Sequence, residues 1–325
     1  MKQRVLSLLK AAPGTYISGE EISQVLGITR SAVWKHMEHL REEGYVIDSV
    51  SRKGYKILSA PDLLYPAEIL EGLDTKVFGR EIHHFHEVDS TNNFAKKLAE
   101  EGAPEGTVVL AEEQIGGRGR LERAWQAPPG GIWMTAVLRP DIQPYLAPSL
   151  TLVAAVAVVQ AVKAVTGLDL LIKWPNDVYL EGGKVCGILT EMKAEMDKVH
   201  YIVIGIGLNV NIDLAEFKKV APDAGSLSAV LHRPVDRKKM TRELLSRLED
   251  NYLIFCREGM DPLLEEWRKH NFTLGRTVVL KQGDRVFTGM AEDITPEGAL
   301  LLRDEQGNTR PFYSGEVTVL KSKNR

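Results

Sequence analysis

The sequence predicts an α+β protein in three parts: a winged helix-turn-helix over residues 1–62, a mixed α/β domain over 66–270 and a small β-barrel over 272–325. Three observations support this. Capped amphipathic segments open the chain, β-rich and helical runs mix in the middle, and short alternating runs separated by turns follow at the end. The length of 325 residues agrees with two or three domains.

Capping signals delimit two helices near the start of the chain. Ser18 can cap a helix together with Glu21 three residues later, and Gly27 ends that helix. Thr29 can then cap a second helix over residues 30–43. Two helices joined by a short turn that contains glycine are typical of a helix-turn-helix.

The exposed start of the second helix and a basic hairpin after it predict contact with DNA. The helix-turn-helix covers Gly19–Glu38, and two strand-like runs at 45–47 and 55–57 flank a basic turn that resembles a wing. Trp34 belongs either to the exposed face or to the core, and the alternative function is a protein-interaction domain whose charges are only solvated. The candidate DNA-binding residues are Arg30, Ser31, Trp34 and Lys35 on the helix and Arg52 and Lys53 in the wing.

Charge and composition narrow the class of protein. The net charge is −3, yet residues 1–60 hold nine Lys and Arg against six acids, which suits a segment that meets a polyanion. Cys186 and Cys256 cannot form a disulfide framework. The first residues lack a signal-peptide pattern, and the apolar run 150–165 is too short and polar to span a bilayer. We therefore expect a cytoplasmic protein with no membrane contact.

Prolines at 61 and 66 mark a linker before the central region, where the strand and helix signals alternate. The β-rich runs are 107–111, 133–138, 170–173 and 202–206, and the helical runs are 93–101, 150–165 and 240–257. Beyond residue 272, further strand signals recur at 277–280, 286–289, 299–302 and 317–320.

Two polar segments of the central region suit an anionic ligand. Residues 89–92 lie between an extended run and a helix, where hydroxyls cap the helix or donate to a ligand. Residues 114–120 combine three glycines with arginines, so backbone amides and guanidinium groups can approach a phosphate or carboxylate. The alternative for the second segment is a flexible basic surface loop.

Two further segments add groups that suit a nucleotide. Residues 173–177 place a lysine, an asparagine and an aspartate around Pro175, and Lys184 follows a turn at 181–183. The lysine suits a phosphate and the aspartate a Mg²⁺ ion, whereas the alternative is a β-turn with local hydrogen bonds. Residues 205–211 form either a buried glycine-containing strand or the wall of a ligand site.

Four runs together resemble the biotin protein ligases: STNNFAKKLAE at 90–100, EEQIGGRGRLERAW at 112–125, KWPNDVYLEGGKVCGIL at 173–189 and GIGLNVNI at 205–212. With a helix-turn-helix before them and a small β domain after them, the whole chain resembles the bifunctional bacterial ligases that also repress the biotin operon. The resemblance implies a central ligase domain of the class II synthetase-like type and an SH3-like barrel at the C-terminus.

The resemblance also implies an activity and a set of residues. Such a ligase joins biotin to ATP, giving biotinyl-5′-AMP and pyrophosphate, and passes biotin to a lysine of a biotin carboxyl carrier domain. The implied biotin-binding residues are Ser90, Thr91, Asn92, Gln114, Arg118, Gly119, Arg120 and Lys184. The implied ATP-binding residues are Arg123, Trp125, Lys173, Asn176, Asp177 and Asn209, with Asp177 as a Mg²⁺ ligand. Lys184, Arg118, Arg120 and Lys173 would be the catalytic residues.

A ligase of this kind can couple its two halves. If biotinyl-AMP completes a homodimer surface, the dimer would read a two-fold operator of the biotin genes. Between Asn211 and His232 the family can place an aromatic residue against adenine, and the aromatic residue of this stretch is Phe217. Two alternatives remain: a ligand-sensing repressor without catalysis, and a lipoate-type ligase.

Overall fold

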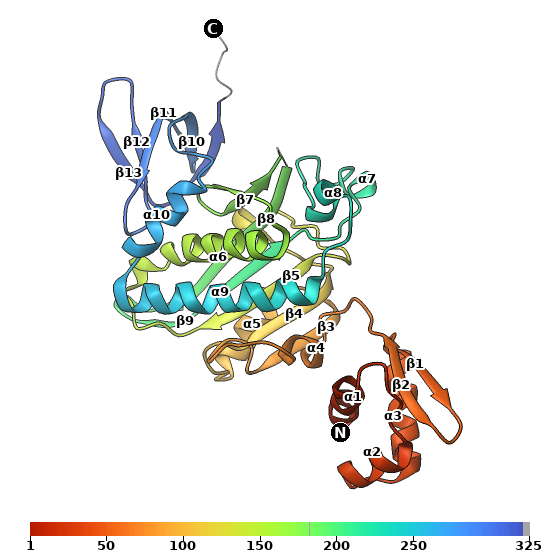
Figure 1. The fold of residues 1–325 in the computed structure, drawn as a ribbon. Helices are drawn as coiled ribbons and strands as arrows, with labels where there is room; N and C mark the ends of the chain where they lie inside the picture. Colours follow the sequence, from red (N-terminus) through yellow and green to blue (C-terminus); the bar gives the residue numbers. More distant parts are fainter. Residues whose placement is uncertain (182, 321–325) are drawn as a thin grey trace. The chain divides into compact units, whose positions relative to one another are not determined.

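The computed structural model describes residues 1–181 and 183–320, which form two compact units, one over Met1–Glu68 and one from Ile69 onward (Figure 1). Gly182 of the predicted turn and residues 321–325 of the predicted third domain lie outside the described residues. The short helix α4, Pro66–Leu70, spans the boundary between the two units.

The first unit is a winged helix-turn-helix, as predicted. It contains α1 (Lys2–Ala11), α2 (Gly19–Leu26), α3 (Arg30–Glu42) and an antiparallel hairpin of β1 (Val46–Val50) and β2 (Gly54–Ser59). Both predicted caps are present, because Ser18 Oγ accepts from Glu21 N at 3.0 Å and Thr29 Oγ1 accepts from Ala32 N at 3.2 Å. The helices enclose a core that includes Val5, Leu9, Ile22, Val33, Met37 and Leu40.

Trp34 lies on the exposed face of α3. Its side chain is 55 % exposed and therefore belongs to the surface rather than to the core. Arg30, Ser31 and Lys35 are exposed on the same helix, and the turn of the hairpin exposes Arg52 and Lys53. The six candidate DNA-binding side chains are thus all accessible.

The second unit is built on a seven-stranded mixed sheet in the order β3-β4-β5-β9-β8-β7-β6. Only the β3–β4 pair is parallel among these strands, and each other neighbouring pair is antiparallel. The strands are β3 (Ile82–Val88), β4 (Val108–Gln114), β5 (Ile132–Leu138), β6 (Leu171–Lys173), β7 (Asp177–Leu180), β8 (Gly183–Ala194) and β9 (Val199–Leu208). The sequence patterns did not predict β7 or β8, whereas the extended run expected before residue 89 is β3.

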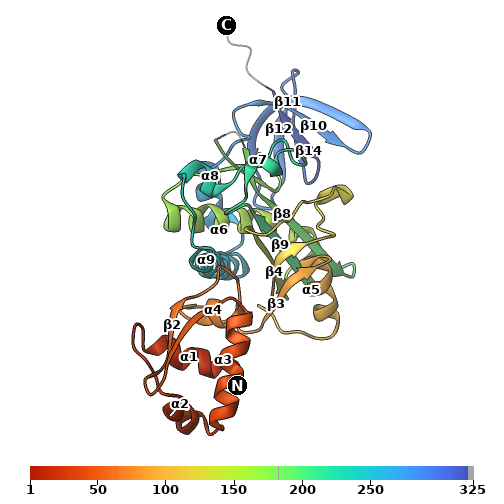
Figure 2. The same ribbon diagram turned by 90° about the vertical axis from the view of Figure 1, so that its right-hand side faces the viewer.

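Helices cover both faces of this sheet, as Figure 2 shows. The long helices α6 (Ser149–Thr166) and α9 (Arg237–Glu258) pack together on one face, and α5 (Thr91–Glu100) lies on the other. Helix α6 is long and apolar enough to cross a membrane by length and composition alone. Its buried position between the sheet and α9 accounts for that apolar character. Shorter helices are α7 (Leu214–Phe217), α8 (Leu227–Leu231) and α10 (Asp261–Lys269).

The C-terminal part is a five-stranded antiparallel sheet in the order β13-β12-β11-β10-β14. Its strands are β10 (Thr277–Gln282), β11 (Arg285–Ile294), β12 (Leu300–Arg303), β13 (Thr309–Phe312) and β14 (Glu316–Val319). Strand β13 escaped prediction because it is an exposed edge strand that contains Pro311, a residue that sheets tolerate at edges. Trp174 donates its Nε1–H to Gly298 O at 3.0 Å, which anchors this sheet to the β6–β7 hairpin.

Candidate active site

One cavity of about 50 Å³ gathers the polar segments that the sequence singled out. It lies where β4, β8 and β9 meet the start of α5 and the loop that follows β4. Nine of the predicted site residues line it: Ser90, Thr91, Asn92, Gln114, Arg118, Gly119, Trp125, Asn176 and Lys184. Segments separated by almost a hundred residues therefore form one binding site.

Glycines on the neighbouring strands β8 and β9 make room for this cavity. Gly187 and Gly207 face each other across the β8–β9 pair, and the Trp125 indole lies against both. A Cβ at Gly187 would lie 2.8 Å from the Trp125 ring, and a Cβ at Gly207 would lie 2.7 Å from its Nε1. A Cβ at Gly205 would lie 2.1 Å from Asn92 Oδ1. The side chain of any other residue at these positions would fill the space that the cavity needs.

Polar groups at the start of α5 form one end of the cavity. Ser90 is the N-cap of the helix, so it caps the helix and lines the cavity at the same time. Gln114 Oε1 accepts hydrogen bonds from Thr91 N at 2.8 Å and from Thr91 Oγ1 at 2.9 Å. These contacts hold a set of neutral donors and acceptors that suits an uncharged polar ring.

Two cationic side chains, Lys184 and Arg118, also line the cavity. Lys184 Nζ lies 2.6 Å from Asp177 Oδ1 and 5.1 Å from the centroid of the Trp125 ring. Arg118 donates to Asn93 Oδ1, while its buried Nε has no hydrogen-bond partner among the described residues. A buried donor without a partner is costly, so this nitrogen is available to an anionic ligand.

The glycine-rich loop folds back on itself beside the cavity and contacts the C-terminal sheet. Gly119 N donates to Arg123 O at 2.7 Å, and Trp125 N donates to Gly117 O at 2.9 Å. Arg120 donates to Asn176 Oδ1 at 3.2 Å and to Gly315 O at 3.1 Å, and burial lowers the pKa of its guanidinium. This segment is therefore a tight turn held from two sides, unlike the flexible surface loop that was the alternative to a ligand-binding segment.

Several predicted residues lie outside the cavity. The Lys173 ammonium lies 5.3 Å from the centroid of the Tyr179 ring, and Arg123 pairs with Glu316 of the C-terminal sheet. Asn209 donates its Nδ2 to Gly225 O at 2.9 Å, while its buried Oδ1 has no hydrogen-bond partner among the described residues. Phe217 is 8 % exposed and packs in a core cluster. Its ring is thus covered rather than presented to a ligand.

The predicted Mg²⁺ site contains one carboxylate, that of Asp177. Asp177 does not line the cavity, and within residues 1–181 and 183–320 no group of three His, Cys, Asp or Glu residues could hold a metal ion. One carboxylate still fits Mg²⁺ when substrate phosphates supply further oxygens, since Mg²⁺ in nucleotide sites keeps few protein ligands.

The patterns missed the apolar wall of the cavity. Met134, Ile188, Leu189 and Ile206 line it together with the glycines of β8 and β9. Among these, only the small-residue pattern of 205–207 gave a signal, because apolar residues in a buried strand look alike whether they face a core or a ligand.

Comparison with known proteins identifies the family. The bifunctional ligase/repressor BirA of Bacillus subtilis is 40 % identical over 321 residues, which cover 98 % of each chain. This chain belongs to the biotin protein ligases. BirA of Escherichia coli is 32 % identical over 320 residues, which cover 97 % of this ligase and 96 % of that protein.

Matches to individual domains and a solved structure agree with that assignment. Residues 2–56 match a helix-turn-helix domain, 85–209 the biotin/lipoate A/B protein ligase family and 273–320 the biotin protein ligase C-terminal domain. The biotin protein ligase of Aquifex aeolicus, solved with biotin and ATP, is 28 % identical, with a TM-score of 0.63 over 75 % of this chain and 100 % of that one. The chain is therefore a biotin protein ligase with a helix-turn-helix domain of the ligase/repressor type, as its sequence motifs predicted.

Proposed function

We propose that this biotin protein ligase activates biotin in the cavity between α5 and Lys184. A carboxylate oxygen of biotin attacks the α-phosphorus of ATP, the bond to the bridging oxygen breaks, and pyrophosphate leaves. The amine of a lysine on a biotin carboxyl carrier domain then attacks the acyl carbon, and AMP leaves. The observation that supports this is the lining of the cavity, which combines neutral hydrogen-bonding groups at the start of α5 with the cations Arg118 and Lys184.

The neutral and the cationic residues of the cavity have separate roles. Ser90, Thr91, Asn92 and Gln114 bind the ureido ring, and the glycine-lined middle accepts the apolar part of biotin. Bringing a carboxylate to a phosphate joins two anions, so Lys184 and Arg118, with Arg120 next to them, neutralise the charge that develops on the α-phosphate. Mg²⁺ bound at Asp177 would shield the phosphates that depart as pyrophosphate.

The remaining predicted residues serve ATP. Trp125 offers an aromatic face beside Lys184, and Asn176 lies between Arg120 and the cavity. The free Oδ1 of Asn209 can accept a hydrogen bond from the amino group of adenine. Arg123 and Lys173 would act from outside the cavity, on the triphosphate.

ATP–pyrophosphate exchange by the purified protein with Mg²⁺ tests this activity. We expect exchange when biotin is added and none with lipoate or without an acid. Exchange with lipoate would identify a lipoate-type ligase. A folded protein that binds biotin and shows no exchange would instead be a ligand-sensing repressor.

The contact between the glycine-rich loop and the C-terminal sheet makes a testable contribution. Replacing Glu316 by lysine is expected to lower exchange, because repulsion of Arg123 withdraws the loop that also holds Arg120. The charge-swapped pair Glu316→Arg with Arg123→Glu should restore part of the activity in the same assay. Equal exchange by Glu316→Lys and wild type would remove this contact from the mechanism.

We further propose that biotinyl-AMP favours a homodimer whose two helix-turn-helix units bind a two-fold operator of the biotin genes in the cytoplasm. Each α3 helix would enter a major groove with Trp34 and Lys35 exposed at its surface. Ligand that binds the dimer more tightly than the monomer must also promote dimerisation by linkage. Sedimentation with and without biotin and ATP tests this, and one unchanged oligomeric state would contradict it.

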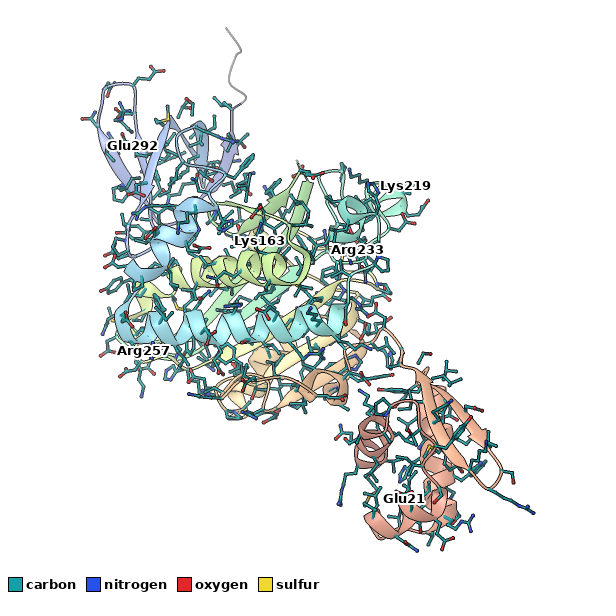
Figure 3. The ribbon with its side chains drawn as sticks, in the orientation of Figure 1. Glu21, Lys163, Lys219, Arg233, Arg257 and Glu292 are labelled. Atoms are coloured by element: carbon teal, nitrogen blue, oxygen red, sulfur yellow. The ribbon has the colours of Figure 1, made fainter. Side chains whose placement is uncertain are left out.

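Removing Lys35 from the exposed face of α3 is expected to weaken operator binding. If Lys35 contacts a phosphate, Lys35→Ala should reduce the slope of log K against log salt concentration by about one for each copy of the protein on the DNA. If Lys35 contacts a base, the variant should lose about 1–3 kcal/mol of binding free energy. Titration of promoter DNA at several salt concentrations measures both. The control is Lys163→Ala, which removes a charge from α6 in the other unit (Figure 3). Identical binding by Lys35→Ala and this control would exclude α3 from the interface.

A further inference from the structure

A hydrogen-bonded chain lies behind the polar end of the cavity and begins at Asn92. This side chain is 4 % exposed and donates its Nδ2 to Glu191 Oε2 at 2.8 Å and to Leu189 O at 3.2 Å. An amide nitrogen has two protons, so both are used. The orientation of the amide is therefore determined, and its Oδ1 faces Thr135 Oγ1 at 2.7 Å.

Glu191 acts in this chain as an acceptor. Lys96 Nζ lies 2.7 Å from Glu191 Oε1, while Asn92 contacts the other oxygen. Burial alone would raise the pKa of Glu191, but the hydrogen bonds from Lys96 and Asn92, together with the charges of Lys96 and Arg118, outweigh it and hold that pKa below its usual value. The carboxylate is ionised at neutral pH, and it has no proton to donate to Asn92.

The oxygens beyond Asn92 outnumber the protons available to them. Thr135 Oγ1 lies 2.7 Å from Asn92 Oδ1 and 2.8 Å from Thr91 Oγ1, which in turn lies 2.9 Å from Gln114 Oε1. The backbone N–H of Thr91 also donates to Gln114 Oε1, so the oxygen of that amide must face Thr91. Three oxygen–oxygen contacts share the two hydroxyl protons of Thr91 and Thr135. One of the three oxygen–oxygen contacts in this hydrogen-bonded chain therefore has no proton of its own.

We propose that Glu191 is a positioning residue for the polar wall of the cavity, which is formed by Thr91, Asn92 and Gln114. Through Asn92, Glu191 makes this wall present oxygen lone pairs, so that the wall selects a ligand that donates N–H groups. The inference rests on the proposed placement of biotin in the cavity. A cyclic urea has two N–H donors, and these can donate to lone pairs of the Thr91, Asn92 and Gln114 oxygens that line the cavity. Glu191 acts through Asn92 and does not touch the ligand.

The isosteric change Glu191→Gln tests the proposal. The new amide can donate to Asn92 Oδ1, which favours turning the Asn92 Nδ2 toward Thr135 at the expense of its hydrogen bond to Leu189 O, and the turned amide supplies the missing proton from within the protein. The oxygens of the wall then no longer need a hydrogen-bond donor from the ligand. We expect the KM for biotin in the exchange assay to rise about tenfold, the value of roughly one neutral hydrogen bond, while kcat stays within about threefold.

The matched control is Glu195→Gln, which changes an exposed carboxylate close by on the same β8–β9 hairpin. Glu195 pairs with His200 at 3.0 Å and is not part of the chain around Asn92. It should leave both kinetic constants unchanged. Thermal unfolding of both variants shows whether the fold is intact.

A specificity measurement separates positioning from simple damage. A biotin analogue in which oxygen replaces one ureido N–H, a cyclic carbamate, lacks one donor. Wild type should prefer biotin to this analogue, and Glu191→Gln should reduce that preference about tenfold. A parallel loss for both substrates, with the preference unchanged, would overturn the proposal. Failure of wild type to show biotin-dependent exchange would instead contradict the proposed function.

A second variant uses pH and does not depend on how Glu191→Gln folds. Lys96→Met removes the partner that helps to hold the pKa of Glu191 down, leaving Arg118 as the other cation whose charge acts on this carboxylate. The pKa then rises, and protonated Glu191 can donate to Asn92 Oδ1 as glutamine does. We expect the KM for biotin to increase on acidification, beginning at a higher pH in Lys96→Met than in wild type. Superimposable pH profiles would refute the proposal.

Discussion

Replacing Lys184 by alanine is expected to lower biotin-dependent ATP–pyrophosphate exchange by a factor of about 10²–10³. The loss corresponds to roughly 2.7–4 kcal/mol, the usual cost of removing one preorganised donor from a site where charge develops. Lys184 lines the cavity, and its ammonium is held between Asp177 and the Trp125 ring. These contacts hold the cation in place before substrates bind, so little reorganisation is needed in the transition state.

The control for this variant is Lys193→Ala on the same strand. Lys193 pairs with Glu100 at 3.0 Å and is more than half exposed, so its loss should leave exchange unchanged. Single-turnover measurement with saturating biotin and ATP separates the chemical step from binding. Exchange by Lys184→Ala within a few-fold of wild type would remove Lys184 from the mechanism.

Replacing Gly207 by alanine is expected to weaken substrate binding by roughly 1–3 kcal/mol, the typical cost of overpacking. The new methyl would lie 2.7 Å from Trp125 Nε1. Gly207 belongs to β9, which pairs with β5 and β8 on either side, so the backbone cannot retreat and the indole must move. Because Trp125 also contacts Lys184, we expect the KM values of both biotin and ATP to increase about 10- to 100-fold.

A compensating change tests the cause of that loss. Combining Gly207→Ala with Trp125→Leu removes the ring that the methyl strikes. The double variant should therefore lose less than the sum of the two single losses. Strict additivity, or KM values for Gly207→Ala within twofold of wild type, would show that the glycine does not position Trp125.

Local signals predicted the long helices and most of the strands. Ser18 and Thr29 begin helices because their side chains satisfy backbone N–H groups that have no partner within the helix. Strand β7 was not predicted because its four residues, although they alternate in burial, are a very short run directly after the turn that follows Lys173. Strand β8 was not predicted because it begins among the glycines around Lys184. The patterns that predict a strand fail where a strand is very short or has small residues facing a ligand.

The sequence by itself determined the family, the helix-turn-helix and the four motif runs, since these depend on residues close together in the chain. The tertiary structure decided which of the basic side chains share the cavity. Arg118 and Lys184 line it, whereas Lys173 lies over Tyr179 and Arg123 pairs with Glu316. The physical reason is register: the pairing of β8 with β9 places Gly187 opposite Gly207, and that pairing depends on packing across the whole sheet rather than on neighbours in sequence.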